Sequence, residues 1–121
     1  MTYGQVVDQY QQSQADFPLP EGVTYPAFPD GYDTSSSYQQ PYGTVITFGV
    51  YECAWEKEWL QTRSVDNTRA TAALDVLLGL PEQPIFQQTI APDSQEYFQG
   101  LLDDASLGDP SGIQGFYDAN C

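Results

Sequence analysis

Histidine is absent from this chain, and basic residues are scarce. Among 121 residues there are no His, three Lys and Arg, and 17 Asp and Glu, which gives a formal charge of −14. Without imidazole the chain has no catalytic triad of the usual kind, no histidine metal ligand and no side chain whose ordinary pKa lies near neutrality. We therefore expect a protein that is not an enzyme, with no cofactor and no metal site.

The few positive charges also bear on partners. Lys57, Arg63 and Arg69 lie within one short stretch, so they form no broad cationic face for phosphate backbones or anionic lipids. We expect no binding to nucleic acid, no direct lipid binding by this segment, and a monomer. The acidic excess is most simply a solvated surface, but it would also speed encounter with an unknown, basic protein partner.

Cysteine is limited to Cys53 and Cys121. No CxxC pair and no histidine accompanies them, which excludes an ordinary structural zinc site. A disulfide between them is the natural interpretation, and disulfides persist outside the reducing cytosol. Two reduced thiols in a cytosolic protein are the alternative.

An export signal is missing from the first residues. Met1–Gln5 have neither the basic start nor the apolar stretch of a leader. If the domain is extracytoplasmic, either secreted or membrane-anchored, we expect its leader or anchor to lie outside these residues.

The first 47 residues divide into two segments of different composition. Residues 1–16 carry Tyr and Val at helical spacing, which predicts a weak amphipathic helix or a frayed stalk. Residues 17–47 are rich in Pro and Tyr, and prolines this frequent disfavour a helix and favour extended backbone. We expect an extended arm that packs on the helical body, its last residues, Thr44–Phe48, leading into a helix. Docking of this arm onto a partner is the alternative.

Residues 48–121 carry helical patterns, and the fold class they predict is mainly α. Helices are expected at about 48–63, from a cap at Asp66 to Gly79, from Asp93 or Ser94 to Gly108, and from Asp109-Pro110 to Cys121, with a loop over 81–92. Short connections favour antiparallel neighbours. The expected architecture is two consecutive helical hairpins, about four helices, closed by one disulfide.

Aromatic residues dominate the expected core of this body. Tyr51, Trp55 and Trp59 are four residues apart, a spacing that indicates a buried helix face more often than a ligand groove. On the third expected helix, Tyr97 also falls on the inward stripe. The predicted core residues are Trp55, Trp59, Leu74, Leu77, Phe98, Leu101 and Phe116.

Other candidate sites have simpler structural interpretations. Asp103 and Asp104 are adjacent on an expected helix and point different ways, so a solvated face is favoured over a shared proton. Residues 30–33 and 108–112 resemble pieces of oxygen-ligand loops but lack the spacing of a calcium loop, so turns and caps are favoured. Lys57 lies among glutamates, which favour its charged, non-nucleophilic form, and this argues against nucleophilic catalysis.

Several segments carry a resemblance to known sequences. They are the arm at 17–26 (FPLPEGVTYP), the stretch at 52–60 (ECAWEKEWL), the turn at 108–110 (GDP) and the closing ANC at 119–121. Together they resemble a group of uncharacterised actinobacterial exported or membrane-anchored small proteins with an LPxGVT-aromatic-P arm, a Cys-Ala-Trp helix and a terminal Asn-Cys. The resemblance implies a domain on the outer side of the membrane and carries no assigned activity.

Together these features predict a non-enzymatic, extracytoplasmic domain that acts by protein–protein contact at the cell envelope. The alternative is a cytosolic acidic decoy, a phosphate mimic that binds a basic nucleic-acid-binding protein. The decoy would need its carboxylates on one exposed face and would tolerate reductant.

Overall fold

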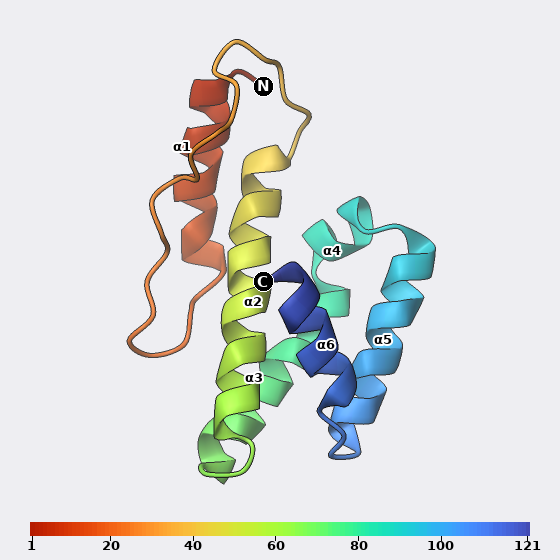
Figure 1. Ribbon diagram of the computed structural model, residues 1–121. Helices are drawn as coiled ribbons and strands as arrows, with labels where there is room; N and C mark the ends of the chain where they lie inside the picture. Colours follow the sequence, from red (N-terminus) through yellow and green to blue (C-terminus); the bar gives the residue numbers. More distant parts are fainter. The chain divides into compact units, whose positions relative to one another are not determined.

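The computed structural model describes residues 1–121 and is helical, with six α-helices, two short 3₁₀ helices and no strand (Figure 1). The chain divides into two compact units, Met1–Tyr51 and Glu52–Cys121. The division falls inside one long helix, α2 (Tyr42–Thr62), four residues beyond the boundary at 47 expected from the sequence. The mainly α fold class is confirmed.

Unit 1 begins with helix α1 (Tyr3–Ser13), followed by a 3₁₀ turn at Gln14–Asp16. A capping box starts α1: the Thr2 hydroxyl accepts from the Gln5 backbone N–H, and the Gln5 side chain accepts from the Thr2 N–H. α1 lies against the start of α2 at Gly43, where an added Cβ would meet the Val6 carbonyl oxygen at 2.5 Å. Only glycine permits this approach of the two backbones.

The segment between α1 and α2 has no helix and no strand, as its prolines predict. It is drawn in orange in Figure 1 and returns along α1. The Tyr10 hydroxyl donates to the Pro26 carbonyl at 2.7 Å, and the Phe28 ring packs edge-on against Tyr3 and Tyr10, with centroids 5.6 Å away in each case. Packing of this arm over residues 48–121 stays a prediction.

Helix α2 starts earlier than the sequence suggested, so residues 42–47 belong to a helix and not to the arm. Their β-branched side chains are tolerated because one of them is buried and hydrogen-bonded. Thr47 is fully buried, and its hydroxyl lies 2.6 Å from that of Ser13 and within hydrogen-bond distance of the Tyr10 carbonyl. Contact with α1 thus decides the conformation here over local β-propensity.

Unit 2 continues with α3 (Asn67–Gly79), a 3₁₀ turn (Leu80–Glu82), α4 (Pro84–Thr89), α5 (Pro92–Ser106) and α6 (Ser111–Asn120). The loop expected over 81–92 is wrong, because α4 forms there. Pro84 and Pro92 occupy first helical positions. The backbone N–H that proline lacks would have no partner within the helix at this position, and the fixed φ of proline suits a helix. Helices α2 to α6 are five where about four were expected after the arm, and the two-hairpin arrangement stays a prediction.

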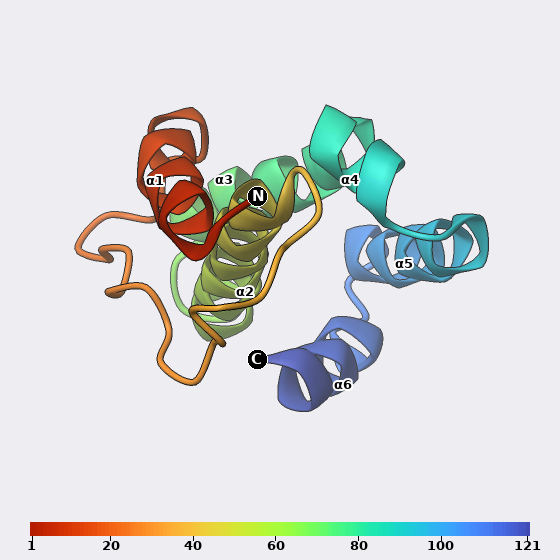
Figure 2. The same ribbon diagram turned by 90° about the horizontal axis from the view of Figure 1, so that it is seen from above.

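The core of unit 2 includes residues of α2 to α6. The Phe98 ring of α5 lies 5.8 Å from Phe86 of α4 and 5.3 Å from Phe116 of α6, measured between centroids. Gly112 of α6 sits so close to α5 that an added Cβ would meet Leu101 Cδ2 at 2.8 Å. Figure 2 shows α4, α5 and α6 following one another in this unit. Other buried residues here are Trp59, Ala70, Ala73, Leu77, Leu80, Ile85, Leu102, Ala105 and Ile113.

Candidate functional site

A disulfide joins Cys53 of α2 to Cys121, directly after α6. The two Cα atoms are 5.8 Å apart and the sequence separation is 68 residues. The predicted pairing is confirmed. Cys121 is an exposed residue, whereas Cys53 is half-buried.

A buried carboxyl group lies against this disulfide. Glu56, three residues after Cys53 on α2, is 0% exposed, and its Oε1 lies 3.7 Å from Cys121 Sγ. A disulfide sulfur carries no hydrogen, so this contact is a hydrogen bond only when the carboxyl is protonated and donates. The second oxygen, Oε2, is buried without a hydrogen-bond partner.

The surroundings of Glu56 favour its neutral form. Burial, and to a lesser extent the charge of Glu52 one turn earlier on α2, raise the pKa of Glu56 to about 9. Burial also raises the pKa of Glu52 to about 7. At pH 7, Glu56 therefore carries its proton, because an ionised carboxylate without a cation in this environment would be strongly disfavoured.

Sequence reasoning missed this carboxyl group. In the sequence, Glu52 and Glu56 stand between the aromatic positions 51, 55 and 59 of α2 and have the pattern of polar, solvent-facing residues. The available signal was spacing, since Cys53 and Glu56 are three residues apart and so share a helix face. A disulfide predicted at Cys53 places Glu56 beside it.

The same three residues form the nearest approach to a metal-ligand set. Sγ of Cys53, a carboxylate oxygen of Glu56 and Sγ of Cys121 all lie within 4.8 Å of one another. Metals bind cysteine as the thiolate, and here both sulfurs are spent in a disulfide. The bonded form therefore offers no thiolate to a metal ion.

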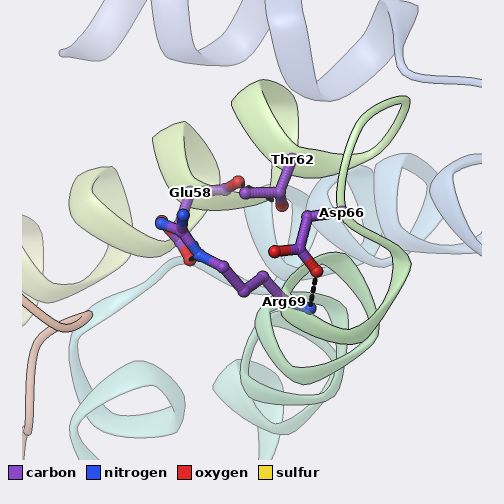
Figure 3. Close-up of polar contacts among 4 residues, drawn as sticks. All are labelled: Glu58, Thr62, Asp66 and Arg69. Carbon is purple, nitrogen blue, oxygen red and sulfur yellow. Dashed lines mark hydrogen bonds and ion pairs between the residues drawn. The ribbon is translucent and has the colours of Figure 1, made fainter.

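An ion pair joins α2 to α3 on the same unit (Figure 3). Arg69 Nε donates to Glu58 Oε2 at 2.9 Å, and Arg69 Nη2 donates to Glu58 Oε1 at 2.7 Å, a bidentate arrangement. Asp66 caps α3 by accepting from the Arg69 backbone N–H at 3.1 Å. One arginine thus ties the predicted cap to the preceding helix.

We expect this ion pair to contribute modestly to stability. Replacing Arg69 by Ala should lower the free energy of unfolding by about 0.5–1 kcal/mol, since the arginine side chain is 56% exposed and solvent screens the pair. A double-mutant cycle of Arg69→Ala with Glu58→Gln, followed by urea unfolding at low and high salt, isolates the coupling. A coupling energy that does not decrease at 1 M salt would contradict an electrostatic origin.

The outer face of α5 carries a second candidate site. Asp93, Glu96, Tyr97, Asp103 and Asp104 are all exposed on it, and with Gly100 and Leu101 they line a shallow depression of about 590 Å³. Tyr97 was expected in the core, but 63% of it is exposed. The inward stripe of α5 is filled instead by Phe98, Leu101, Leu102 and Ala105.

The predicted core residues divide by burial. Trp59, Leu77, Phe98 and Leu101 are buried, while Trp55, Leu74 and Phe116 are half-buried. Of these, Phe98 and Phe116 are in ring contact, and Leu101 lies against Gly112. These residues form packing contacts around the sites and bear no ionisable group.

The loop carboxylates act locally. Asp33 accepts from the Ser35 N–H and from the hydroxyls of Ser35 and Ser36, and Asp109 accepts from the N–H and hydroxyl of Ser111. These hydrogen bonds lower the pKa of both aspartates. The turn roles favoured by the sequence are seen here, but Pro110 and not Asp109 is the cap residue of α6, which starts at Ser111.

The fold and its bridge define a small, acidic, all-helical protein with one disulfide. None of its helices has both the length and the apolar character needed to cross a membrane. No known family model matches the chain, and no curated protein or solved structure is significantly similar to it.

Proposed function

We propose that this protein is a non-enzymatic, extracytoplasmic interaction module that uses the acidic face of α5 to bind a basic protein segment. The observation that carries the proposal is the arrangement of Asp93, Glu96, Asp103 and Asp104 around the exposed Tyr97. Together with Gly100, these residues form steps of three or four residues along α5, from 93 to 96 and 97, to 100, and to 103 and 104, so the carboxylates border one side of the helix over roughly 16 Å.

The chemistry of this face selects its partner. Carboxylates form bidentate hydrogen bonds with guanidinium groups, and a tyrosine ring offers a face to a cation. The formal charge of −14 on 121 residues attracts a basic partner from a distance and repels an acidic one. An arginine-containing segment therefore fits this face better than an apolar or acidic one.

Location outside the cytosol is supported by the bridge between Cys53 and Cys121, because such bridges persist in oxidising compartments. Thiol counting by intact mass on protein freshly isolated from its native source tests this part. Two blocked cysteines support the proposal. Two free thiols together with a melt unaffected by reductant would favour the cytosolic decoy instead.

Titration with an octa-arginine peptide, followed by calorimetry, tests the binding face. The triple variant Glu96→Gln, Asp103→Asn, Asp104→Asn should weaken binding about tenfold or more, since each charge-assisted contact contributes on the order of 1 kcal/mol. Tyr97→Ala should weaken it about threefold or more.

A matched control distinguishes the effect of the α5 face on affinity from the effect of net charge. The variant Asp30→Asn, Asp75→Asn, Glu82→Gln removes three exposed acids elsewhere and gives the same charge, −14 + 3 = −11. It should change affinity by less than about threefold, because distant exposed charges are screened. Equal losses in both triple variants, with no effect of Tyr97→Ala, would show diffuse attraction and overturn the assigned face.

A further inference from the structure

We propose that the Cys53–Cys121 disulfide is a reversible redox site in which Glu56 donates a proton to the thiolate that leaves when an external thiol attacks. This goes beyond the binding role above and does not depend on it. The inference starts from three facts about Glu56: it is fully buried, one carboxyl oxygen lies 3.7 Å from Cys121 Sγ, and the other has no hydrogen-bond partner.

A disulfide that serves only to hold the fold needs no carboxyl group beside it. A buried polar atom without a partner destabilises the folded state, and an isosteric apolar residue at position 56 would avoid that cost. A protonated carboxyl within 4.8 Å of both sulfurs supplies the proton that disulfide cleavage consumes. The arrangement is therefore suited to the breaking and reforming of the bond.

The exposure of the two cysteines sets the direction of attack. Cys121 is the more exposed residue of the pair, so in the proposed step a thiolate R–S⁻ from a small-molecule or protein thiol attacks its Sγ. The bond between Cys121 and Cys53 breaks, a Cys121–S–R bond forms, and the electron pair goes to Cys53 Sγ. Glu56, a carboxyl oxygen of which lies within 4.8 Å of Cys53 Sγ as well, transfers its proton to this thiolate, which gives the Cys53 thiol and the Glu56 carboxylate.

A second thiolate then completes the reduction. It attacks the R sulfur of the mixed disulfide and releases R–S–S–R and the Cys121 thiolate, which takes a proton from water. The sum is two R–SH plus the protein disulfide giving R–S–S–R plus two protein thiols, and Glu56 recovers its proton from solvent. The external thiol is oxidised and the protein is reduced by two electrons.

Few other groups influence this carboxyl. The charge of Glu52 on α2 disfavours ionisation of Glu56. On α6, the titratable residues near the bridge are Tyr117 and Asp118. The Asp118 carboxylate accepts from the Gln114 amide at 2.9 Å and has its own partner. No cation offsets the charge that Glu56 acquires after transfer, so its reprotonation is favoured.

Reduction of the intact protein by dithiothreitol tests the proposal. We expect the reduction rate to be proportional to the thiol concentration. Dividing this rate by the fraction of dithiothreitol present as thiolate gives a rate per thiolate. This rate per thiolate should be constant up to about pH 8 and should fall above pH 9, where Glu56 loses its proton. Glu56→Gln should lower the rate at pH 7 about tenfold or more and abolish this decline, since an amide supplies no acidic proton.

The exposed Glu82→Gln variant is the matched control and should behave as the wild type. If the rate saturates with thiol concentration, reduction waits for unfolding, the bridge is purely structural and the proposal is overturned. It is also overturned if Glu56→Gln, with native helix content by circular dichroism, keeps the wild-type rate and pH profile. Should that variant fail to fold, the wild-type profile decides alone: a rate per thiolate that stays constant through pH 10 contradicts the proposal.

Discussion

Replacing both Cys53 and Cys121 by alanine should lower the free energy of unfolding by about 4 kcal/mol. The bridge closes a loop of 68 positions, and its removal frees the denatured chain to adopt many more conformations, an effect of roughly this size on the chain-entropy model. This is a large share of the stability of a small domain. Thermal unfolding should follow, with a midpoint lower by about 10 °C or more.

Urea unfolding of the oxidised protein, the reduced protein and the double variant measures this effect. Reduction and substitution should give similar losses if both act through the denatured chain. Circular dichroism at low temperature provides the control, because the helices of the variant should still form. A loss below about 1 kcal/mol would contradict a stabilising role for the bridge.

Stability should decrease as the pH rises from about 5 to about 9, the reverse of the usual acid-sensitive behaviour of carboxylates. The pKa of Glu52 rises from an ordinary 4.5 to about 7 in the folded state, and that of Glu56 to about 9. Above pH 4.5 the unfolded chain releases these protons while the folded chain keeps them. The folded state binds more protons, so raising the pH favours unfolding.

The size of this decline follows from the two shifts. Each group contributes at most about 1.4 kcal/mol for each pH unit between its unfolded and folded pKa. Both groups act up to pH 7 and Glu56 alone continues to pH 9, which gives a total of several kcal/mol. Glu56→Gln should remove most of the decline and leave stability near pH 4 almost unchanged, because the amide resembles the protonated acid.

Urea unfolding at pH 4, 5, 7 and 9 measures this profile, with Glu82→Gln as the exposed control. Below about pH 4 a second effect sets in, because hydrogen bonds lower the pKa of Asp33 and Asp109 in the folded state. These hydrogen bonds stabilise the fold fully at a pH above the pKa of the two aspartates in the unfolded chain. That stabilisation is lost as the pH falls through the pKa of the aspartates in the folded state. Maximum stability should therefore lie near pH 5, and a flat profile from pH 5 to 9 would contradict the buried neutral state of Glu56.

Local rules explain much of what the sequence predicted. The Asp66 cap of α3 was read from residue type and spacing, and the structure shows the expected hydrogen bond to the Arg69 N–H. The disulfide followed from the number and placement of Cys53 and Cys121. These features depend on a few neighbouring residues or on simple pairing, so one sequence is sufficient to identify them.

Other elements depend on contacts that spacing does not contain. Prolines at 81, 84 and 92 favoured a loop, but Pro84 starts helix α4, where Ile85 and Phe86 are buried. Tyr97 has the spacing of the inward stripe of α5, yet Phe98 and Leu101 fill the available space and Tyr97 faces solvent. Such choices between adjacent positions are made by the packing of neighbouring helices.

The sequence by itself determined the helical class, the acidic surface, the lack of histidine chemistry and the pairing of the cysteines, because composition and local periodicity encode them. Only the tertiary structure decided that Glu56 is buried against the disulfide without a cation, since burial and the distance between Glu56 and Cys121, 65 residues apart, arise from folding. The chemistry proposed for this protein lies in that contact, because a carboxyl group changes its protonation only through the surroundings that folding gives it.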